Sequence, residues 1–138
     1  MEYSKIDKLN VIPSLLGFGC MRFPKKEDGT IDEVEAERML DYAIESGVTY
    51  IDTAYPYHDG ESEPFVGRVL KKYKREDFYL ATKLPMFKID SLEQAKEIFE
   101  EQMKRLDVDY VDFYLLHALN KDTWKKVIDL NIIPYCEE

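Results

Sequence analysis

The stretch GVTYIDTAYPYHDGESEPFVG, residues 47–67, contains a short apolar strand, a polar loop and the start of an amphipathic helix. The expected strand, residues 48–52, is rich in β-branched and aromatic side chains and ends in Asp52. The loop carries Tyr57, and Ser62 is the expected N-cap of the helix that follows. A strand that leads into a helix in this way is the repeating unit of a parallel α/β sheet.

The same unit recurs along the chain. Further strands are expected over residues 15–19, 78–82 and 111–116, each followed by a helical pattern. The four strand starts are 33, 30 and 33 residues apart, close to the roughly 31 residues of one unit in an eight-unit TIM barrel. We therefore predict an α/β fold with one domain over residues 1–138. It would be a truncated TIM barrel, a half barrel of about four βα units with parallel strands and outer helices.

Local signals mark the ends of the expected helices. Asp32 with Glu35, and Ser91 with Gln94, have the spacing of capping pairs. Gly47 has the position of a glycine that ends the first helix. A fourth helix is expected to begin near Asp122, with an inward face made by three apolar side chains, Trp124, Val127 and Ile128. Asp112 interrupts the last apolar strand and would need a hydrogen-bond partner if buried.

The composition limits the class of partner. A net charge of −9 argues against non-specific binding to nucleic acid and against attraction to an anionic membrane surface. The chain has no apolar run long enough to cross a membrane, and its N-terminus does not resemble a secretory signal. Its two cysteines, Cys20 and Cys136, have no disulfide or metal-ligand spacing, so we expect free thiols and a cytoplasmic location.

Four chemically active residues occur where strands end. Functional groups of parallel α/β sheets lie at the carboxyl ends of the strands. Asp52 ends the second expected strand, Tyr57 lies in the next loop, Lys83 follows the third strand and His117 follows the fourth. We therefore expect these four side chains to converge on one mouth of the fold.

Together the four side chains make sense as a proton-donating site. A phenol ordinarily has a pKa of about 10, and a neighbouring ammonium favours its ionised form. Lys83 would supply the ammonium, Asp52 would hold the lysine, and His117 would donate a hydrogen bond to a carbonyl oxygen.

Other interpretations remain open on the residues alone. Lys83 could be a solvated strand end, Asp52 could cap a turn, and His117 could be an ordinary loop histidine. Lys83 could also serve a Schiff-base lyase, because such lysines end barrel strands too. A metal site formed by His58, Asp59 and His117 would have poor ligand spacing, and we predict none.

Four segments of the chain resemble the aldo-keto reductase family. They are residues 47–67, quoted above, LGFGCMRFP (16–24), FYLATKLP (78–85) and VDYVDFYLLHAL (108–119). Within the family the chain most resembles the bacterial oxidoreductases that often carry a C-terminal iron–sulfur module. The resemblance implies a TIM barrel and NADPH-dependent interconversion of small carbonyl substrates and alcohols.

The resemblance also assigns roles by position. Tyr57 would be the general acid, Lys83 and Asp52 would tune it, and His117 would orient the carbonyl. Four residues would approach the nicotinamide end of NADPH: Gly19, Cys20, Met21 and Asp52.

The family has eight βα units, whereas about four are expected here. The second half of the family's barrel carries the contacts to the nicotinamide amide, the pyrophosphate and the 2′-phosphate. We therefore expect weak or absent NADPH affinity for these 138 residues. Four strands also leave two open edges. These edges predict either a homodimer that completes the barrel or a loosely associating, aggregation-prone fragment. The alternative function is a catalytically inactive remnant that acts as a structural or partner-binding fragment.

Overall fold

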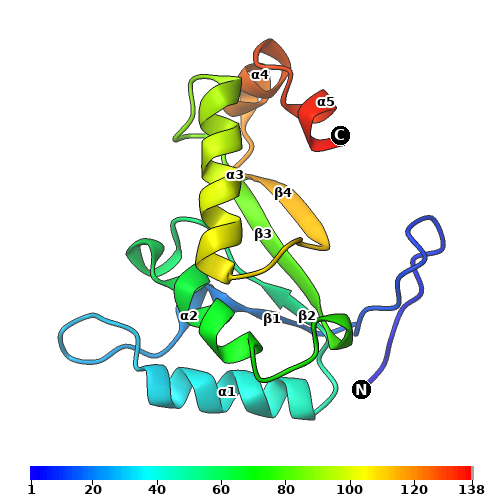
Figure 1. Ribbon diagram of the computed structural model, residues 1–138, viewed down its shortest axis with the longest axis vertical. Coiled ribbons are helices and arrows are strands. Elements are labelled where there is room, and N and C mark those ends of the chain that lie inside the picture. Colours follow the sequence, from blue (N-terminus) through cyan, green and yellow to red (C-terminus); the bar gives the residue numbers. More distant parts are fainter. Residues whose placement is uncertain (138) are drawn as a thin grey trace.

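The computed structural model describes residues 1–137 and contains a four-stranded parallel sheet in the order β1-β2-β3-β4 (Figure 1). The strands are β1 (Gly17–Gly19), β2 (Tyr50–Asp52), β3 (Tyr79–Pro85) and β4 (Phe113–His117). The α-helices are α1 (Glu33–Glu45), α2 (Ser62–Leu70), α3 (Leu92–Leu106), α4 (Lys121–Asp129) and α5 (Ile132–Glu137). Three short 3-10 helices are η1 (Cys20–Arg22), η2 (Tyr57–Gly60) and η3 (Arg75–Asp77). The predicted α/β fold of successive parallel strand–helix units is confirmed.

The strand ends differ from those predicted. The ladder between β3 and β4 continues to the pair Pro85–His117, so β3 extends beyond residue 82. Lys83 consequently lies inside β3, and His117 is the last residue of β4, whereas both were predicted to follow their strands. The strand ends are fixed by pairing between neighbouring strands. The β-propensity of the residues alone does not predict this pairing.

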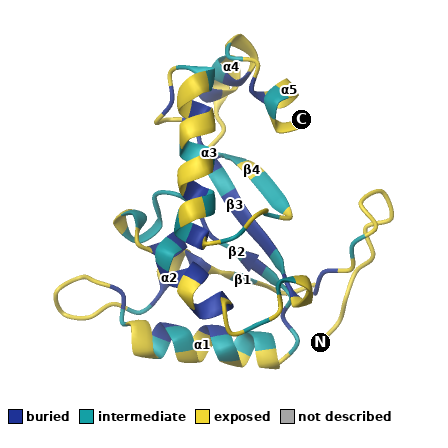
Figure 2. Ribbon diagram, in the orientation of Figure 1, coloured by how far each residue is buried: buried dark blue, intermediate teal, exposed yellow. Residues whose placement is uncertain are grey.

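The core lies between the sheet and its helices. One buried cluster joins α1 and α2 to the outer face of the sheet through residues such as Leu40, Val66 and Leu80. A second cluster, which includes Leu84 and Val127, lies where α3, α4 and the end of β3 meet. Figure 2 shows buried residues along β2 and β3 and on the sheet-facing sides of the helices, with exposed residues outside. The edge strands β1 and β4 contain no buried residue.

The prediction that Trp124, Val127 and Ile128 form an inward face of α4 is only partly confirmed. Val127 is buried, but the side chains of Trp124 and Ile128 are 46% and 54% exposed. The helix therefore packs through a narrower stripe than the apolar pattern suggests.

Most predicted helix signals are confirmed. The Asp32 side chain accepts a hydrogen bond from Glu35 N (3.4 Å), and Ser91 accepts one from Gln94 N (3.2 Å). Gly47 follows α1 with a φ of +94°, a conformation that glycine adopts without strain. Ser62 is not the N-cap of α2, because it lies in the first turn of that helix.

Asp112 is exposed as a residue, but its carboxylate is largely covered and has hydrogen-bond partners. Its carboxylate accepts hydrogen bonds from Leu80 N (2.7 Å) and from the Arg75 guanidinium (2.6 Å). The carboxylate thereby ties the entry of β4 to β3.

An N-terminal hairpin, residues 3–14, lies beyond the amino-terminal end of the sheet, and its residues 3–10 are exposed. Antiparallel bridges join Tyr3 to Ser14 and Ile6 to Val11. Ser14 and Thr49 exchange hydrogen bonds of 2.9 Å between backbone N–H groups and hydroxyls. Figure 1 shows this hairpin beyond the ends of β1 and β2. The carboxyl ends of the strands are thus left for the functional residues. Within residues 1–137, no helix combines the length and apolarity needed to cross a membrane.

Candidate active site

The inner face of the sheet carries the candidate site. Gly19 pairs with Asp52, and Asp52 pairs with Ala81, two residues before Lys83 in β3. Because side chains alternate along a strand, Asp52 and Lys83 point to the same face. His117 ends β4 on that face, and Tyr57 reaches it from η2. The structure thus brings all four predicted residues together.

The Lys83 ammonium is the centre of this group. Its Nζ donates hydrogen bonds to Asp52 Oδ1 (2.6 Å), to the Thr53 carbonyl (2.8 Å) and to the Tyr57 hydroxyl (3.1 Å). The Lys83 side chain is 12% exposed and that of Asp52 is 25% exposed. Three acceptors use all three donors of an ammonium. This arrangement disfavours the Schiff-base alternative, which needs a neutral amine as its nucleophile.

The His117 ring contacts Tyr57 and a second aromatic side chain. Its centroid lies 5.7 Å from the Tyr57 ring, nearly edge-on, and 5.8 Å from the Phe87 ring. Burial and then the nearby Lys83 ammonium lower the pKa of His117, although the Asp52 carboxylate acts in the opposite direction. The neutral imidazole is therefore favoured at neutral pH.

The residues predicted near the cofactor occupy different environments. A Cβ placed on Gly19 would meet no atom within 4 Å, so the space beside Asp52 on the inner face is open. Met21 is exposed, whereas Cys20 is fully buried. Burial and then the Asp52 carboxylate raise the pKa of the Cys20 thiol. Its sulfur lies in the core, so only the backbone of Cys20 is available to a ligand.

A buried polar network lies behind Lys83. Glu63 in α2 is fully buried, and its Oε1 accepts hydrogen bonds from the Thr82 hydroxyl (2.6 Å) and from Gln102 Nε2 (2.7 Å). Gln102 Nε2 also lies 3.1 Å from the Lys83 carbonyl oxygen, and Gln102 Oε1 accepts from the Tyr114 hydroxyl (2.8 Å). The network joins α2 and α3 to the two strands that carry Lys83 and His117.

We predict that replacing Glu63 by glutamine alters how stability depends on pH. Burial raises the pKa of the Glu63 carboxyl, against its hydrogen bonds and the Arg105 charge. A raised folded-state pKa stabilises the protein below the ordinary pKa of a glutamate, and this contribution is lost as pH rises through the raised value. The stability of Glu63→Gln relative to the parent should therefore increase as pH rises. Urea unfolding from about pH 4 to about pH 8 measures this difference.

Glu101 provides a control of opposite sign. Its hydrogen bond from the Tyr55 hydroxyl, and then the Arg105 side chain, lower its pKa. Glu101→Gln should lose stability relative to the parent as pH rises. A pH-independent difference for Glu63→Gln would contradict the prediction for the buried carboxyl.

The alternative metal ligands do not form a cluster. Within the described residues, no group of three or more His, Cys, Asp or Glu side chains could hold a metal ion. His58 instead accepts a hydrogen bond from the backbone N–H of Phe23. Cys20 and Cys136 are both free thiols, as expected.

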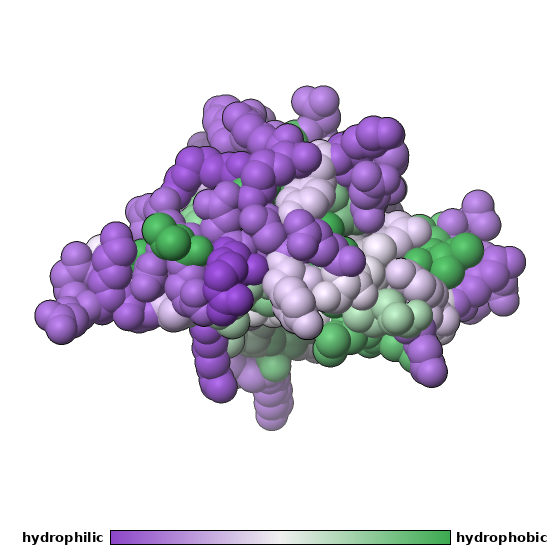
Figure 3. All heavy atoms as spheres, turned by 90° about the horizontal axis from the view of Figure 1, so that it is seen from below, coloured by the Kyte–Doolittle hydropathy of each residue, from purple (hydrophilic) through white to green (hydrophobic). Residues whose placement is uncertain are grey.

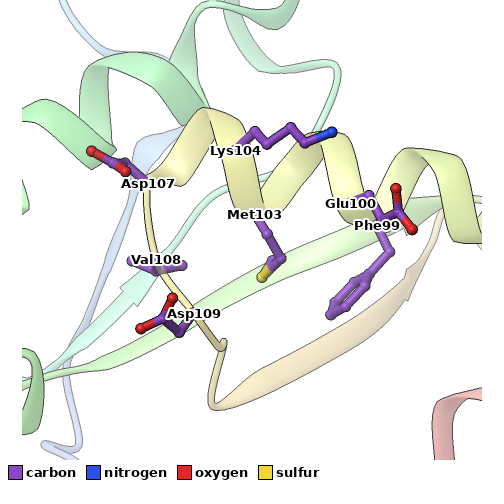
Figure 4. Close-up of a pocket in the computed structure, with 7 residues that line it drawn as sticks. All are labelled: Phe99, Glu100, Met103, Lys104, Asp107, Val108 and Asp109. Carbon is purple, nitrogen blue, oxygen red and sulfur yellow. The ribbon is translucent and has the colours of Figure 1, made fainter.

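An open groove beside α3 does not belong to the candidate site. Figure 4 shows Phe99 and Met103 pointing from α3 toward the sheet, with Val108 to their left and charged side chains around them. None of the four candidate residues lines this groove.

Two contacts of the site were not predicted. The Thr53 carbonyl is the third acceptor for Lys83, and Phe87 packs against His117. A backbone acceptor carries no residue-type signal. Phe87 comes from a loop whose sequence does not reveal its distance from His117.

Comparisons with known proteins place these observations in one family. A sequence model described as the aldo/keto reductase family matches residues 15–138. The chain is 36% identical over 115 residues to a probable aldo-keto reductase of Glycine max, covering 78% of this chain and 33% of that protein. It is 34% identical over 125 residues to an aldo-keto reductase of Bacillus subtilis, covering 85% of this chain and 38% of that protein.

Solved structures share the fold. The holo form of an aldo-keto reductase from Bacillus halodurans matches with a TM-score of 0.74 at 32% identity, over 96% of this chain and 47% of that one. An aldo-keto reductase from Klebsiella pneumoniae in complex with NADPH matches with a TM-score of 0.72, over 93% and 45%. At 22% identity the second likeness shows the fold alone. The chain therefore spans about half the length of these structures and less than half that of the curated relatives.

Proposed function

Because this chain belongs to the aldo/keto reductase family, we propose that it interconverts carbonyl compounds and alcohols with NADPH, and that Tyr57 is the general acid. The observation that carries the proposal is the Lys83 ammonium, which lies 3.1 Å from the Tyr57 hydroxyl and is held by Asp52 at 2.6 Å. A phenol beside an ammonium can give up its proton because the positive charge stabilises the oxygen left behind.

The chain's own residues divide the work of proton transfer. The Tyr57 hydroxyl would donate its proton to the carbonyl oxygen as negative charge develops there. Lys83 would stabilise the ionised phenol, and the Asp52 carboxylate would keep Lys83 in place. Recovery of a proton from solvent would return Tyr57 to its starting state.

His117 would orient the substrate. Its lowered pKa favours the neutral ring, which still carries one N–H. That N–H would donate a hydrogen bond to the same carbonyl oxygen, beside the Tyr57 ring at 5.7 Å. A neutral donor can do this without competing with Lys83 for the Asp52 carboxylate.

The inner face beside β1 would receive the nicotinamide ring. The open space over Gly19 adjoins Asp52, and the exposed Met21 follows in η1. Gly19, Asp52, Met21 and the Cys20 backbone would hold this end of the cofactor. The bound nicotinamide would supply the hydride.

The test is carbonyl-dependent oxidation of NADPH by the purified chain, with a panel of aldehydes and ketones. We expect activity only at high NADPH concentration, because the 138 residues span about half of the solved reductases. Fluorescence titration should give weak NADPH binding, and a micromolar Kd would contradict that expectation. Absence of carbonyl reduction at saturating NADPH would count against the function. Trapping of Lys83 by borohydride in the presence of substrate would favour the lyase instead.

We also propose that the chain self-associates as a two-fold dimer. In the described part of the chain, β1 and β4 each pair on one side only. Both open edges adjoin grooves. Leu16, Met39 and Tyr42 line the groove beside β1. Phe99 and Tyr114, together with two carboxylates, Asp109 and Asp112, line the groove beside β4. Figure 3 shows the side of α1, where apolar side chains lie among charged ones. Two copies together have the eight strands that a closed barrel of this type requires.

Light scattering over a range of concentrations should show a dimer. Tyr42→Glu would place a charge in the groove beside β1 and should shift the equilibrium toward monomer. Val34→Glu is the matched control, because Val34 lies on the same helix, is 82% exposed and does not line that groove. A compact monomer at every concentration would refute the dimer.

A further inference from the structure

The loop that positions Tyr57 has an unusual backbone. His58, Asp59 and Gly60 follow Tyr57 directly and have φ values of +53°, +56° and +95°. Only glycine adopts this region freely, and two successive non-glycine residues there are uncommon. Such a conformation persists where surrounding contacts hold it.

The His58 ring makes one of the contacts that hold this loop across the fold. Its Nε2 accepts a hydrogen bond of 3.1 Å from the backbone N–H of Phe23. The ring also packs on the Phe23 ring at 5.6 Å, and Phe23 in turn packs on Phe65 of α2 at 5.0 Å. The imidazole therefore ties the loop after β2 to the segment that follows η1, 35 residues earlier.

This hydrogen bond requires a neutral imidazole. An imidazole nitrogen accepts a hydrogen bond only when it carries no proton, so the neutral ring must hold its proton on Nδ1. Nδ1 of His58 is buried and has no hydrogen-bond partner within the described residues. Protonation of Nε2 would place its N–H opposite the Phe23 N–H, and two donors cannot form a hydrogen bond, so the tie to Phe23 would be lost.

The charges around His58 influence the pH at which its Nε2 becomes protonated. Burial and then the Lys25 ammonium lower its pKa, against Asp59. The pocket that His58 lines also contains charged groups from the neighbouring loop, from α1 and from η2 and its end: Lys26, Asp28, Glu33, Asp59 and Glu61. Since the folded-state pKa is depressed, the tie is present above the ordinary histidine pKa and is lost as pH falls through the lowered value.

We propose that His58 is a positioning residue whose neutral imidazole holds the Tyr57 loop against Phe23 and whose protonation releases that loop. A released loop would no longer hold the Tyr57 hydroxyl beside Lys83. The effect of this release on proton transfer rests on the function proposed above. The tie itself is a property of the folded chain and needs neither cofactor nor substrate.

The test is NMR spectroscopy of the whole chain, which contains two histidines, His58 and His117. Nitrogen shifts should report the Nδ1–H tautomer for His58 at neutral pH. The Phe23 amide and the Tyr57 ring signal, assigned from Tyr57→Phe, should shift with the His58 titration. Exchange of the Phe23 amide with water, corrected for the intrinsic pH effect, should rise about 10-fold or more once His58 is protonated. His117→Gln removes the other titration, and the Phe23 response should persist in that variant.

Two substitutions of His58 separate the hydrogen bond from the ring contact. His58→Gln places a non-titrating carbonyl oxygen near the position of Nε2, so the Phe23 amide should stay protected at low pH. His58→Phe keeps the ring and removes the acceptor, so the amide should exchange rapidly at every pH. A Phe23 amide that ignores His58 protonation in the parent chain, or that follows His117 instead, would overturn the proposal. Because no readout involves catalysis, these results stand whether or not the chain reduces carbonyls.

Discussion

Replacing Tyr57 by phenylalanine should lower the rate of carbonyl reduction by about 10²–10⁴-fold. The substitution removes one oxygen atom, which lies 3.1 Å from Lys83 Nζ, and keeps the aromatic ring against His117. Lys83 still donates to the Asp52 carboxylate and to the Thr53 carbonyl. The loss should therefore fall on proton transfer, with little change in the fold.

The measurement is the rate of NADPH oxidation at saturating cofactor and carbonyl compound. Tyr50→Phe is the matched control, because Tyr50 lies in β2 on the same face as Asp52, two residues away. That control should keep a rate within about twofold of the parent, as expected for a hydroxyl that takes no part in the transition state. NADPH affinity should be similar in all three proteins. An unchanged rate for Tyr57→Phe would show that Tyr57 is not the general acid.

The convergence of these side chains could be predicted because most of them occupy equivalent places in successive strand–helix units. Asp52, Lys83 and His117 lie at or near the ends of neighbouring parallel strands, and such ends meet at one edge of a sheet. Their mutual distances could not be predicted in the same way. The 2.6 Å contact of Lys83 with Asp52 depends on how β3 is placed against β2, which the register determines.

The features that the sequence did not reveal depend on contacts between distant segments. The tie between His58 and Phe23 joins residues 35 apart, and no sequence pattern links this histidine to its partner. The Ser62 hydroxyl, predicted as a helix cap, instead contacts the Thr53 hydroxyl (2.9 Å) and the Cys20 carbonyl (3.2 Å). A local pattern predicts that a serine lies near a helix start, whereas tertiary packing decides which partner its hydroxyl takes.

Replacing Gly67 by alanine should destabilise the fold by at least about 2 kcal/mol, although alanine is the better helix former by roughly 1 kcal/mol. A Cβ on Gly67 would lie 2.5 Å from the Leu106 carbonyl oxygen and 2.9 Å from the Arg105 carbonyl oxygen. Both obstacles are backbone atoms at the end of α3, so no side-chain rotation relieves the overlap. The helices would have to separate, and α2 would pull Glu63 away from Thr82 and Gln102.

Gly19→Ala is the matched control for Gly67→Ala. A Cβ on Gly19 would meet no atom within 4 Å, and the φ of −92° at this position suits alanine. We expect its free energy of unfolding to stay within about 0.5 kcal/mol of the parent. Urea unfolding of the two variants compares a glycine required by helix packing with one that leaves space on the inner face. Equal stabilities would mean that α2 and α3 can separate at little cost. If Gly19→Ala kept its stability but bound NADPH less tightly, the open space at β1 would be space that the cofactor needs, whereas Gly67 is needed for the fold that presents it.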